Sequence, residues 1–339
     1  MIIYRLSLKI SLMVDRSMIL VTGGSGQLGR KLVVRLIESG YKVRAHYRSR
    51  VKADRWCPAK AEAVFGDLLE PSWLEKATTD CRYVVHCAAK VSLRPMAIEP
   101  MRSINVEGTR AVIRACRKAA VKRLVHVSST AAVGGSKGEM LDETAEFNLA
   151  GSGIPYFECK RESELLVLQA NSDDFETVVV NPSIMISPPD RRLEPSDKKR
   201  FPKFLPFYFD FGINVVDTRD VVDGIILAFE KGRPGERYIL GGENIDANKL
   251  FELTKKYLDI KKPRLKVPLF LLFLAGALWE AATFYKDRKP PLNRAIVRLA
   301  RSRFYYDSSK AKNELGWQPR PLEQSIKEIL EAIDYGIDS

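Results

Sequence analysis

Short apolar runs alternate with amphipathic stretches along the first half of the chain. Residues 18–22 form the first apolar run and are followed by glycine, which is typical of a buried parallel strand. Leucines at helical spacing follow in residues 27–39, and Gly40 is the expected end of that helix. The same alternation predicts further strands at 41–47, 61–65, 83–87, 124–127 and 177–180, and further helices at 105–119 and 156–170.

Strands that alternate with helices require crossover connections, and such connections give a parallel sheet. We therefore expect an α/β chain with a Rossmann-type, doubly wound parallel sheet in residues 18–185. Residues 213–231, a further strand and helix, would also belong to this domain. Residues 186–212 and 232–339 have a looser pattern and are expected to form a smaller C-terminal α/β substrate-binding region.

Residues 1–17 precede the first predicted strand. Their apolar positions are interrupted by charges, and they lack the small-residue cleavage site of a signal peptide. The stretch is also too short and too charged to span a bilayer. We expect a disordered extension or a start codon set too early, with a weak interfacial anchor as the alternative.

Cysteine and histidine usage narrows the chemistry. The five cysteines are an odd number without a C-x-x-C pair, which argues against a disulfide framework or a zinc site. The three histidines include no pair at metal-ligand spacing, so no metal is expected. A reducing, cytoplasmic location fits this composition.

Positive charge is concentrated in one part of the chain. The net charge is +13, and residues 255–303 hold 13 Lys and Arg against three acids. No nucleic-acid-binding motif accompanies this excess, so nucleic acid is not an expected partner. Within the basic region, residues 267–279 are apolar throughout, which is too short a run for a comfortable membrane span. Residues 267–285 are therefore expected either to lie in the plane of a membrane interface, as a peripheral contact, or to be buried against the substrate-binding region or a dimer partner.

A glycine-rich loop follows the first strand and opens the first helix. In such a loop one glycine permits the tight turn, a second lets the backbone approach a pyrophosphate, and a third lets helix and strand pack closely. The N–H groups at the start of the helix then face the phosphates. The strand–loop–helix context predicts dinucleotide binding by Thr22, Gly23, Gly26, Gln27, Leu28 and Gly29.

The end of the second strand indicates which dinucleotide is bound. A carboxylate there would bond the ribose 2′-hydroxyl of NAD, but the chain has Arg44, Arg48 and Arg50 and no acid before Asp54. Guanidinium groups suit a 2′-phosphate. NADP(H) is therefore favoured, with NAD(H) as the alternative.

Tyr156 and Lys160 are four residues apart in a predicted helix and so lie on one face. A free tyrosine has a pKa of about 10, and a nearby ammonium favours the phenolate. Such a tyrosine can give or take a hydroxyl proton while hydride moves to or from a nicotinamide. Ser129 or Thr130, at the end of the fifth predicted strand, would hold the substrate oxygen.

These segments resemble an extended short-chain dehydrogenase/reductase of the NAD(P)-dependent epimerase/dehydratase type. The likeness runs from Met18 to about Ile333 and is nearest to the dihydroflavonol reductase-like and 3β-hydroxysteroid dehydrogenase-like branch. Besides the loop and the Tyr/Lys pair, it is carried by residues 66–68, 86–89, 105–109, 127–129, 181–183 and 315–319.

The resemblance implies further cofactor-binding residues. Asp67 would contact the adenine amino group and Arg48 the 2′-phosphate, while Asn181 and Ser183 would lie beside the nicotinamide. The remaining positions implied by matching segments are Leu68, Ala88, Ala89 and Asn105, together with Tyr156 and Lys160 themselves.

The leading hypothesis is an NADP(H)-dependent oxidoreductase that interconverts a secondary alcohol and a ketone on an apolar or ring-bearing substrate, such as a steroid, terpenoid or flavonoid. One alternative is an NAD-dependent nucleotide-sugar epimerase or dehydratase, and another is a non-catalytic, cofactor-sensing or membrane-docked binding protein. In the related superfamily the helices corresponding to 105–119 and 156–170 commonly pack against their copies, which implies a homodimer.

Overall fold

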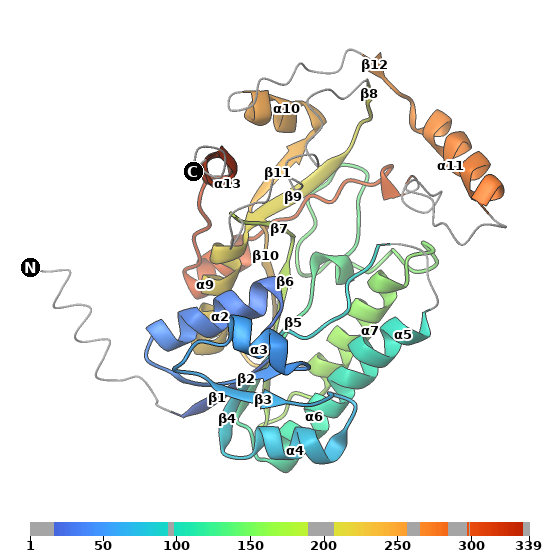
Figure 1. Ribbon diagram of the computed structural model, residues 1–339. Coiled ribbons are helices and arrows are strands. Elements are labelled where there is room, and N and C mark those ends of the chain that lie inside the picture. The colour runs from blue at the N-terminus through green and yellow to red at the C-terminus, as the bar shows by residue number, and fades with distance from the viewer. Residues whose placement is uncertain are drawn as a thin grey trace, which may run out of the picture.

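The computed structural model describes residues 17–93, 98–188, 207–255, 265–283, 297 and 299–334. Among these residues, seven strands form one parallel sheet in the order β10-β6-β5-β4-β1-β2-β3 (Figure 1). The parallel, doubly wound fold expected from the sequence is confirmed. The strands are β1 Met18–Thr22, β2 Lys42–Tyr47, β3 Glu62–Phe65, β4 Cys81–His86, β5 Arg123–Val127, β6 Glu176–Pro182 and β10 Arg237–Leu240.

Helices cover both faces of this sheet (Figure 1). Their apolar sides form two separate cores with the two faces of the strands. One face carries α2 Gln27–Glu38, α3 Arg50–Trp56, α9 Thr218–Lys231 and the short η3 Ala311–Leu315. The other carries α4 Pro71–Thr78, α6 Gly108–Lys118 and α7 Pro155–Gln169, with α5 Glu99–Arg102 leading into α6 through the π-helical turn η1 Ser103–Glu107.

A smaller region stands beyond the carboxyl ends of the main strands (Figure 1). Its three-stranded sheet has the order β11-β9-β7, and β8 pairs separately with β12. The elements of this region are β7 Ile184–Ile186, β8 Phe207–Tyr208, β9 Gly212–Asp217, β11 Glu243–Asp246, α10 Ala247–Lys255, β12 Leu265–Lys266, α11 Leu269–Thr283 and α13 Leu322–Asp334. Most of residues 187–211 and nearly all of the N-terminal extension lie outside the described residues, so the predictions for them stay predictions.

The structure differs from the sequence-based domain division at two strands. β9 leaves the main sheet and pairs with β7 and β11, although its following helix α9 does pack on the main sheet. β10, which was assigned to the substrate-binding region, instead pairs with β6 as the last strand of the main sheet. All four β10 residues are buried at the edge of the main sheet. β6 pairs with the β10 backbone, Tyr238 and Leu240 pack in the core shared with α9, and Ile239 packs with Val133 and Tyr306.

Candidate cofactor and catalytic site

The glycine loop between β1 and α2 packs so closely that side chains would not fit. A Cβ on Gly29 would lie 2.2 Å from the Gly23 carbonyl oxygen, and one on Gly23 would lie 2.9 Å from the Ala88 backbone. Gly23 also has a φ of +77°, which favours glycine. The first turn of α2 holds no acidic residue, and Gly26 offers no side-chain cap. Its N–H groups are therefore suited to an anion such as a phosphate.

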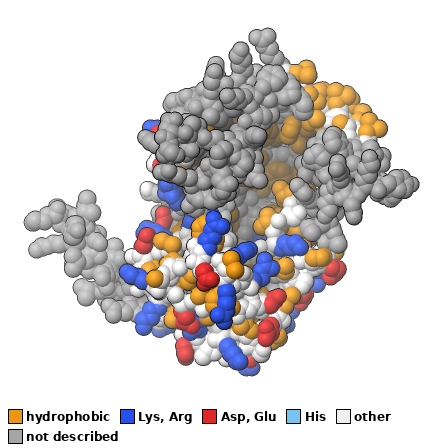
Figure 2. All heavy atoms as spheres, viewed as in Figure 1, with side chains coloured by type: hydrophobic (Ala, Val, Ile, Leu, Met, Phe, Trp, Pro, Cys, Tyr) orange, Lys and Arg blue, Asp and Glu red, His pale blue; other side chains and the backbone are white. Residues whose placement is uncertain are grey.

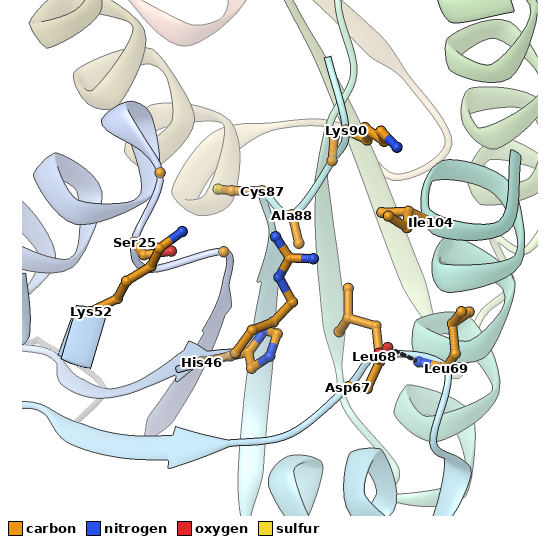
Figure 3. Close-up of a pocket in the computed structure, with 14 residues that line it drawn as sticks. Ser25, His46, Lys52, Asp67, Leu68, Leu69, Cys87, Ala88, Lys90 and Ile104 are labelled. Atoms are coloured by element: carbon orange, nitrogen blue, oxygen red, sulfur yellow. Dashed lines mark hydrogen bonds between the residues drawn. The ribbon is translucent and has the colours of Figure 1, made fainter. Parts of the chain in front are cut away.

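A cavity of about 540 Å³ opens beside this loop. It lies where the carboxyl ends of β1, β2, β3 and β4 meet (Figure 3), which is where open α/β sheets bind ligands. Lys52 reaches from α3 toward the Ser25 side of the cavity, whereas Lys90 and Ile104 lie on the other side. The lining residues are Gly23, Ser25, Gly26, His46, Arg48, Lys52, Asp67, Leu68, Leu69, Cys87, Ala88, Ala89, Lys90 and Ile104.

About half of the predicted cofactor residues line this cavity: Gly23, Gly26, Arg48, Asp67, Leu68, Ala88 and Ala89. Sequence reasoning missed the cationic Lys52 and Lys90, and it missed Ile104 of η1. Helix α3 was not predicted, so no pattern placed Lys52 near the loop. Lys90 directly follows Ala88-Ala89, and that adjacency could have indicated it.

Two other predicted residues fix the wall of the cavity from behind. The Thr22 hydroxyl accepts a hydrogen bond from the Ala88 N–H at 3.2 Å and lies 2.7 Å from His86 Nδ1. The Asn105 amide accepts from the Lys90 N–H at 2.7 Å and donates to the Lys90 carbonyl at 2.9 Å. Both side chains are buried, so they hold the segment after β4 in place.

Tyr156 and Lys160 come from α7 and are both buried. Burial raises the pKa of Tyr156, and a side-chain hydrogen bond with Ser129 opposes this rise. The Ser129 hydroxyl also accepts from the Ala131 N–H at 3.2 Å. Of the two candidate hydroxyls, the one that meets the Tyr156 phenol in the described structure is therefore that of Ser129.

The Lys160 ammonium donates to the Val127 carbonyl oxygen at 2.9 Å. Burial lowers the pKa of Lys160 to about 8, whereas interactions with the Glu164 carboxylate and with the ionised form of Cys87 act in the opposite direction. His86 and His126 on the neighbouring strands also have lowered pKa values, first because they are buried and then because Lys160 is close. Since Cys87 lines the cavity, the Lys160 site adjoins it.

Burial, the largest cause, raises the pKa of the Tyr156 phenol. The expectation from the sequence that Lys160 stabilises a Tyr156 phenolate stays a prediction. Among the described residues, the Lys160 ammonium bonds to a backbone carbonyl. The neutral phenol favoured by this environment can give a proton to a substrate oxygen.

Asn181 and Ser183 lie at the end of β6, and both are buried. Within the described part of the chain, Asn181 Oδ1 and Ser183 Oγ have no hydrogen-bond partner. Buried polar atoms are usually paired, so these two fit a site made to meet a polar ligand. Together with the glycine cradle and the Arg48, Lys52 and Lys90 cations, they fit a pyrophosphate-bearing dinucleotide.

Comparison with known proteins agrees with this geometry. Residues 19–206 match the model of the NAD dependent epimerase/dehydratase family. A putative dihydroflavonol 4-reductase of Synechocystis is 32% identical, with 91% of this chain and 92% of the relative covered. Sterol demethylase protein B of Methylococcus capsulatus is 31% identical over 88% of this chain and 93% of the relative. The crystal structure of gox2253 is 30% identical and superposes with a TM-score of 0.77, covering 94% of this chain and 98% of that one.

Proposed function

We propose that this protein, which belongs to the NAD-dependent epimerase/dehydratase family, interconverts a secondary alcohol and a ketone on an apolar, ring-bearing substrate. Within that family it is an NAD(P)-dependent enzyme of the extended short-chain dehydrogenase/reductase type. The observation that carries the proposal is the buried Tyr156 phenol, which meets the Ser129 hydroxyl and shares one helix face with the buried Lys160. The names of the relatives, a dihydroflavonol reductase and a sterol demethylase protein, support ring-bearing substrates.

In the reductive direction Tyr156 is the proton donor, because its raised pKa keeps the phenol protonated at neutral pH. Ser129 orients the phenol and offers a second hydroxyl to the substrate oxygen. The Lys160 ammonium stabilises the negative charge left on Tyr156 after the proton has moved. When bound, the reduced nicotinamide supplies the hydride. We therefore propose Ser129, rather than Thr130, as the hydroxyl that holds the substrate oxygen.

A Tyr156→Phe variant tests the chemical step. We expect it to lower kcat by about 10²- to 10⁴-fold, since general acid catalysis is lost. The assay follows NADPH oxidation with a panel of ring ketones, such as 5α-androstan-3-one and dihydroquercetin. Tyr41→Phe, which removes a surface phenol bonded to Glu230, is the matched control and should keep full activity. Equal rates for Tyr156→Phe and the unchanged protein would contradict the proposal.

We propose NADP(H) as the cofactor. Arg48 and Lys52 both line the cavity on the side reached from the end of β2, where a 2′-phosphate would lie. A 2′-phosphate paired with a guanidinium forms charge-assisted hydrogen bonds, which are stronger than neutral ones.

Fluorescence titration with NADPH and NADH tests this choice. Arg48→Ala should weaken NADPH binding about tenfold or more and leave NADH binding nearly unchanged. Arg50→Ala is the control, because Arg50 stacks over Phe65 and does not line the cavity. Tightly retained NAD in the purified protein, with weak NADPH binding, would instead favour the epimerase or dehydratase function that the family also contains.

We further propose a peripheral contact between α11 and an anionic bilayer. No helix among the described residues is long and apolar enough to cross a membrane. One face of α11 is nonetheless an exposed apolar stripe, with Phe270 57%, Leu274 53% and Leu278 73% exposed, while Leu272 on the opposite face is buried. Figure 2 shows hydrophobic surface where α11 lies in Figure 1. Seven Lys and Arg flank the apolar stretch in residues 261–266 and 286–289, and they suit anionic lipid head groups.

Sedimentation with vesicles tests this contact. The protein should pellet with phosphatidylcholine vesicles that contain phosphatidylserine and pellet less with phosphatidylcholine alone. A Leu274→Asp/Leu278→Asp variant should stay in the supernatant, whereas Val34→Asp on α2, also an exposed apolar position, should not change the result. Unchanged pelleting of the double variant would contradict the proposal.

A further inference from the structure

Glu164 is a carboxylate with no exposed surface, placed behind the catalytic residues. It lies on α7 four residues beyond Lys160 and eight beyond Tyr156, so all three share one side of the helix. A buried carboxylate is costly unless it is paired and hydrogen-bonded, and each oxygen of Glu164 has such a partner.

The two carboxylate oxygens have different partners. Oε1 accepts from Arg237 Nη1 at 2.8 Å and lies 3.4 Å from Arg161 Nη1. Oε2 accepts from Asn181 Nδ2 at 2.5 Å, and the same Asn181 nitrogen donates to the Ser129 carbonyl at 3.0 Å. Glu164 is thereby connected through one amide to the backbone of the residue whose hydroxyl meets Tyr156.

Arg237 fixes the carboxylate from the other side. Its side chain is nearly buried, and it also donates from Nε to the Glu143 carbonyl at 2.8 Å and from Nη2 to the Ala145 carbonyl at 3.2 Å. Arg237 is the first residue of β10, the strand that closes the edge of the main sheet. The orientation of Glu164 therefore depends on the docking of that strand.

We propose that Glu164 is a positioning residue for the catalytic site, which holds Asn181 and the Ser129 backbone in place through Oε2 and places a carboxylate one helical turn from the Lys160 ammonium. This inference rests on the proposed function, because that function assigns the catalytic roles of Lys160 and Ser129. It assigns a purpose to the buried Glu164–Arg237 pair, which is 73 residues apart in sequence and which no local pattern indicates.

Several ionisable groups surround the Lys160 ammonium. Cys87 and His86 approach from the β4 side and His126 from β5, while Glu164 approaches from its own helix. The two histidines stay neutral at pH 7, because burial and Lys160 lower their pKa values. Burial also keeps the Cys87 thiol protonated. Glu164 is the one carboxylate among these groups, which are all in the described part of the chain, and it acts to raise the pKa of Lys160.

An NMR titration of lysine labelled with ¹³C at Cε tests the charge effect without any substrate. The Lys160 signal is assigned by its absence from a Lys160→Met sample. We expect this signal to titrate near pH 8 in the unchanged protein and about one unit lower in Glu164→Gln, which keeps the length of the side chain and removes its charge. Glu162→Gln is the matched control. Glu162 lies at the surface of α7, its carboxylate pairs with Arg102 of α5, and its replacement should not move the Lys160 signal.

A Glu164→Asp variant separates the effect of the carboxylate charge from that of the side-chain length. The aspartate keeps the charge, so the Lys160 titration should stay close to that of the unchanged protein, but it is one methylene too short to hold Asn181. Ketone reduction by this variant should therefore lose kcat with little change in KM for NADPH. If Glu164→Gln fails to fold, Glu164→Gln/Arg237→Met removes the buried pair together and should show the same lowered Lys160 titration.

An unmoved Lys160 signal in folded Glu164→Gln, equal to that of Glu162→Gln, would overturn the inference. This outcome is distinct from failure of the proposed function, which would appear as absent ketone reduction in the unchanged protein whatever the titration shows.

Discussion

At the residue scale, burial has opposite effects on the pKa values of the proposed catalytic pair: it raises that of Tyr156 and lowers that of Lys160. The Tyr156 phenol is kept neutral, whereas Lys160 titrates within the range of an ordinary assay. The two side chains lie on one helix face but have different partners. The Tyr156 phenol meets the Ser129 hydroxyl, and the Lys160 ammonium donates to the Val127 carbonyl. The protonation state of Lys160 should therefore be visible in the kinetics.

We expect kcat/KM for ketone reduction to fall as pH rises through about 8. Below that pH the Lys160 ammonium is present, and above it the amine is neutral and no longer stabilises the ionised Tyr156. The measurement is a pH profile from 6 to 10 with NADPH and a ring ketone. Thermal unfolding of the same samples is the control for loss of fold, and a flat profile to pH 10 would show that Lys160 plays no such part.

His126 should make the fold sensitive to acid. In the described structure neither of its ring nitrogens has a partner, and burial, followed by Lys160 and His86, holds its pKa well below 6.5. As pH falls through about 6.5, His126 takes up a proton in the unfolded chain but stays neutral in the folded protein. The free energy of unfolding therefore keeps its full value above about pH 6.5 and decreases below it.

Urea unfolding of His126→Leu at pH 8 and pH 5 measures this contribution. Relative to the unchanged protein, the variant should gain about 2 kcal/mol between the two pH values, because one proton uptake is removed. The comparison at pH 8 accounts for any packing defect. The same pH dependence in both proteins would rule out His126 as the source.

Sequence could place some of these residues and not others, for a physical reason. Tyr156 and Lys160 are four residues apart on one helix, and the glycines are close together at the start of another. Such short spacings can be recognised in the sequence. Glu164 and Arg237 meet only because β10 docks beside β6. Lys52 reaches the cavity only because residues 50–56 form a helix, and that segment has no clear apolar period.

At the element scale, the turn into α2 depends on a contact within its own loop. Gly29 approaches the Gly23 carbonyl so closely that any side chain would push the helix away from β1. The strand, loop and helix therefore act as one unit, and a change in their spacing should remove both stability and dinucleotide binding.

Gly29→Ala and Gly108→Ala form a matched test of this unit. Gly29→Ala should destabilise the fold by about 1–3 kcal/mol and weaken NADPH binding, since its Cβ would lie 2.2 Å from a carbonyl oxygen. Gly108 opens α6, and its Cβ would meet nothing closer than 3.9 Å, so Gly108→Ala should be neutral or stabilising by up to about 1 kcal/mol. Chemical denaturation and NADPH titration measure both, and equal behaviour of the two variants would refute the close-packing argument.

The sequence predicted the existence and order of the long elements better than their pairing. Strands such as β4 and β6 are apolar runs, and their periodicity identifies them locally. Periodicity does not specify a partner strand, so the departure of β9 to a second sheet and the arrival of β10 could not be derived. Both depend on long-range packing.

At the scale of the whole molecule, α6 and α7 lie side by side on one face of the sheet (Figure 1) and are the proposed dimer contact. Small-angle scattering should then give twice the 38.3 kDa mass of the chain. Leu165→Arg, at an exposed position of α7, should reduce the mass to that of one chain, while Val34→Arg on α2 should not. A monomeric mass for the unchanged protein would remove the dimer proposal.

The return of the chain from the smaller region to the main sheet has a consequence for biogenesis. β10 completes the sheet edge, and Trp317 is buried in the same core as β1, with its indole N–H donating to the Asp220 carbonyl at 2.7 Å. During synthesis the edge of the main sheet at β6 therefore stays open until β10 leaves the ribosome, and the core stays incomplete until residues near Trp317 follow. An unpaired β6 is a template for another chain during that interval. We expect the nascent protein to need chaperone cover over this long stretch of translation.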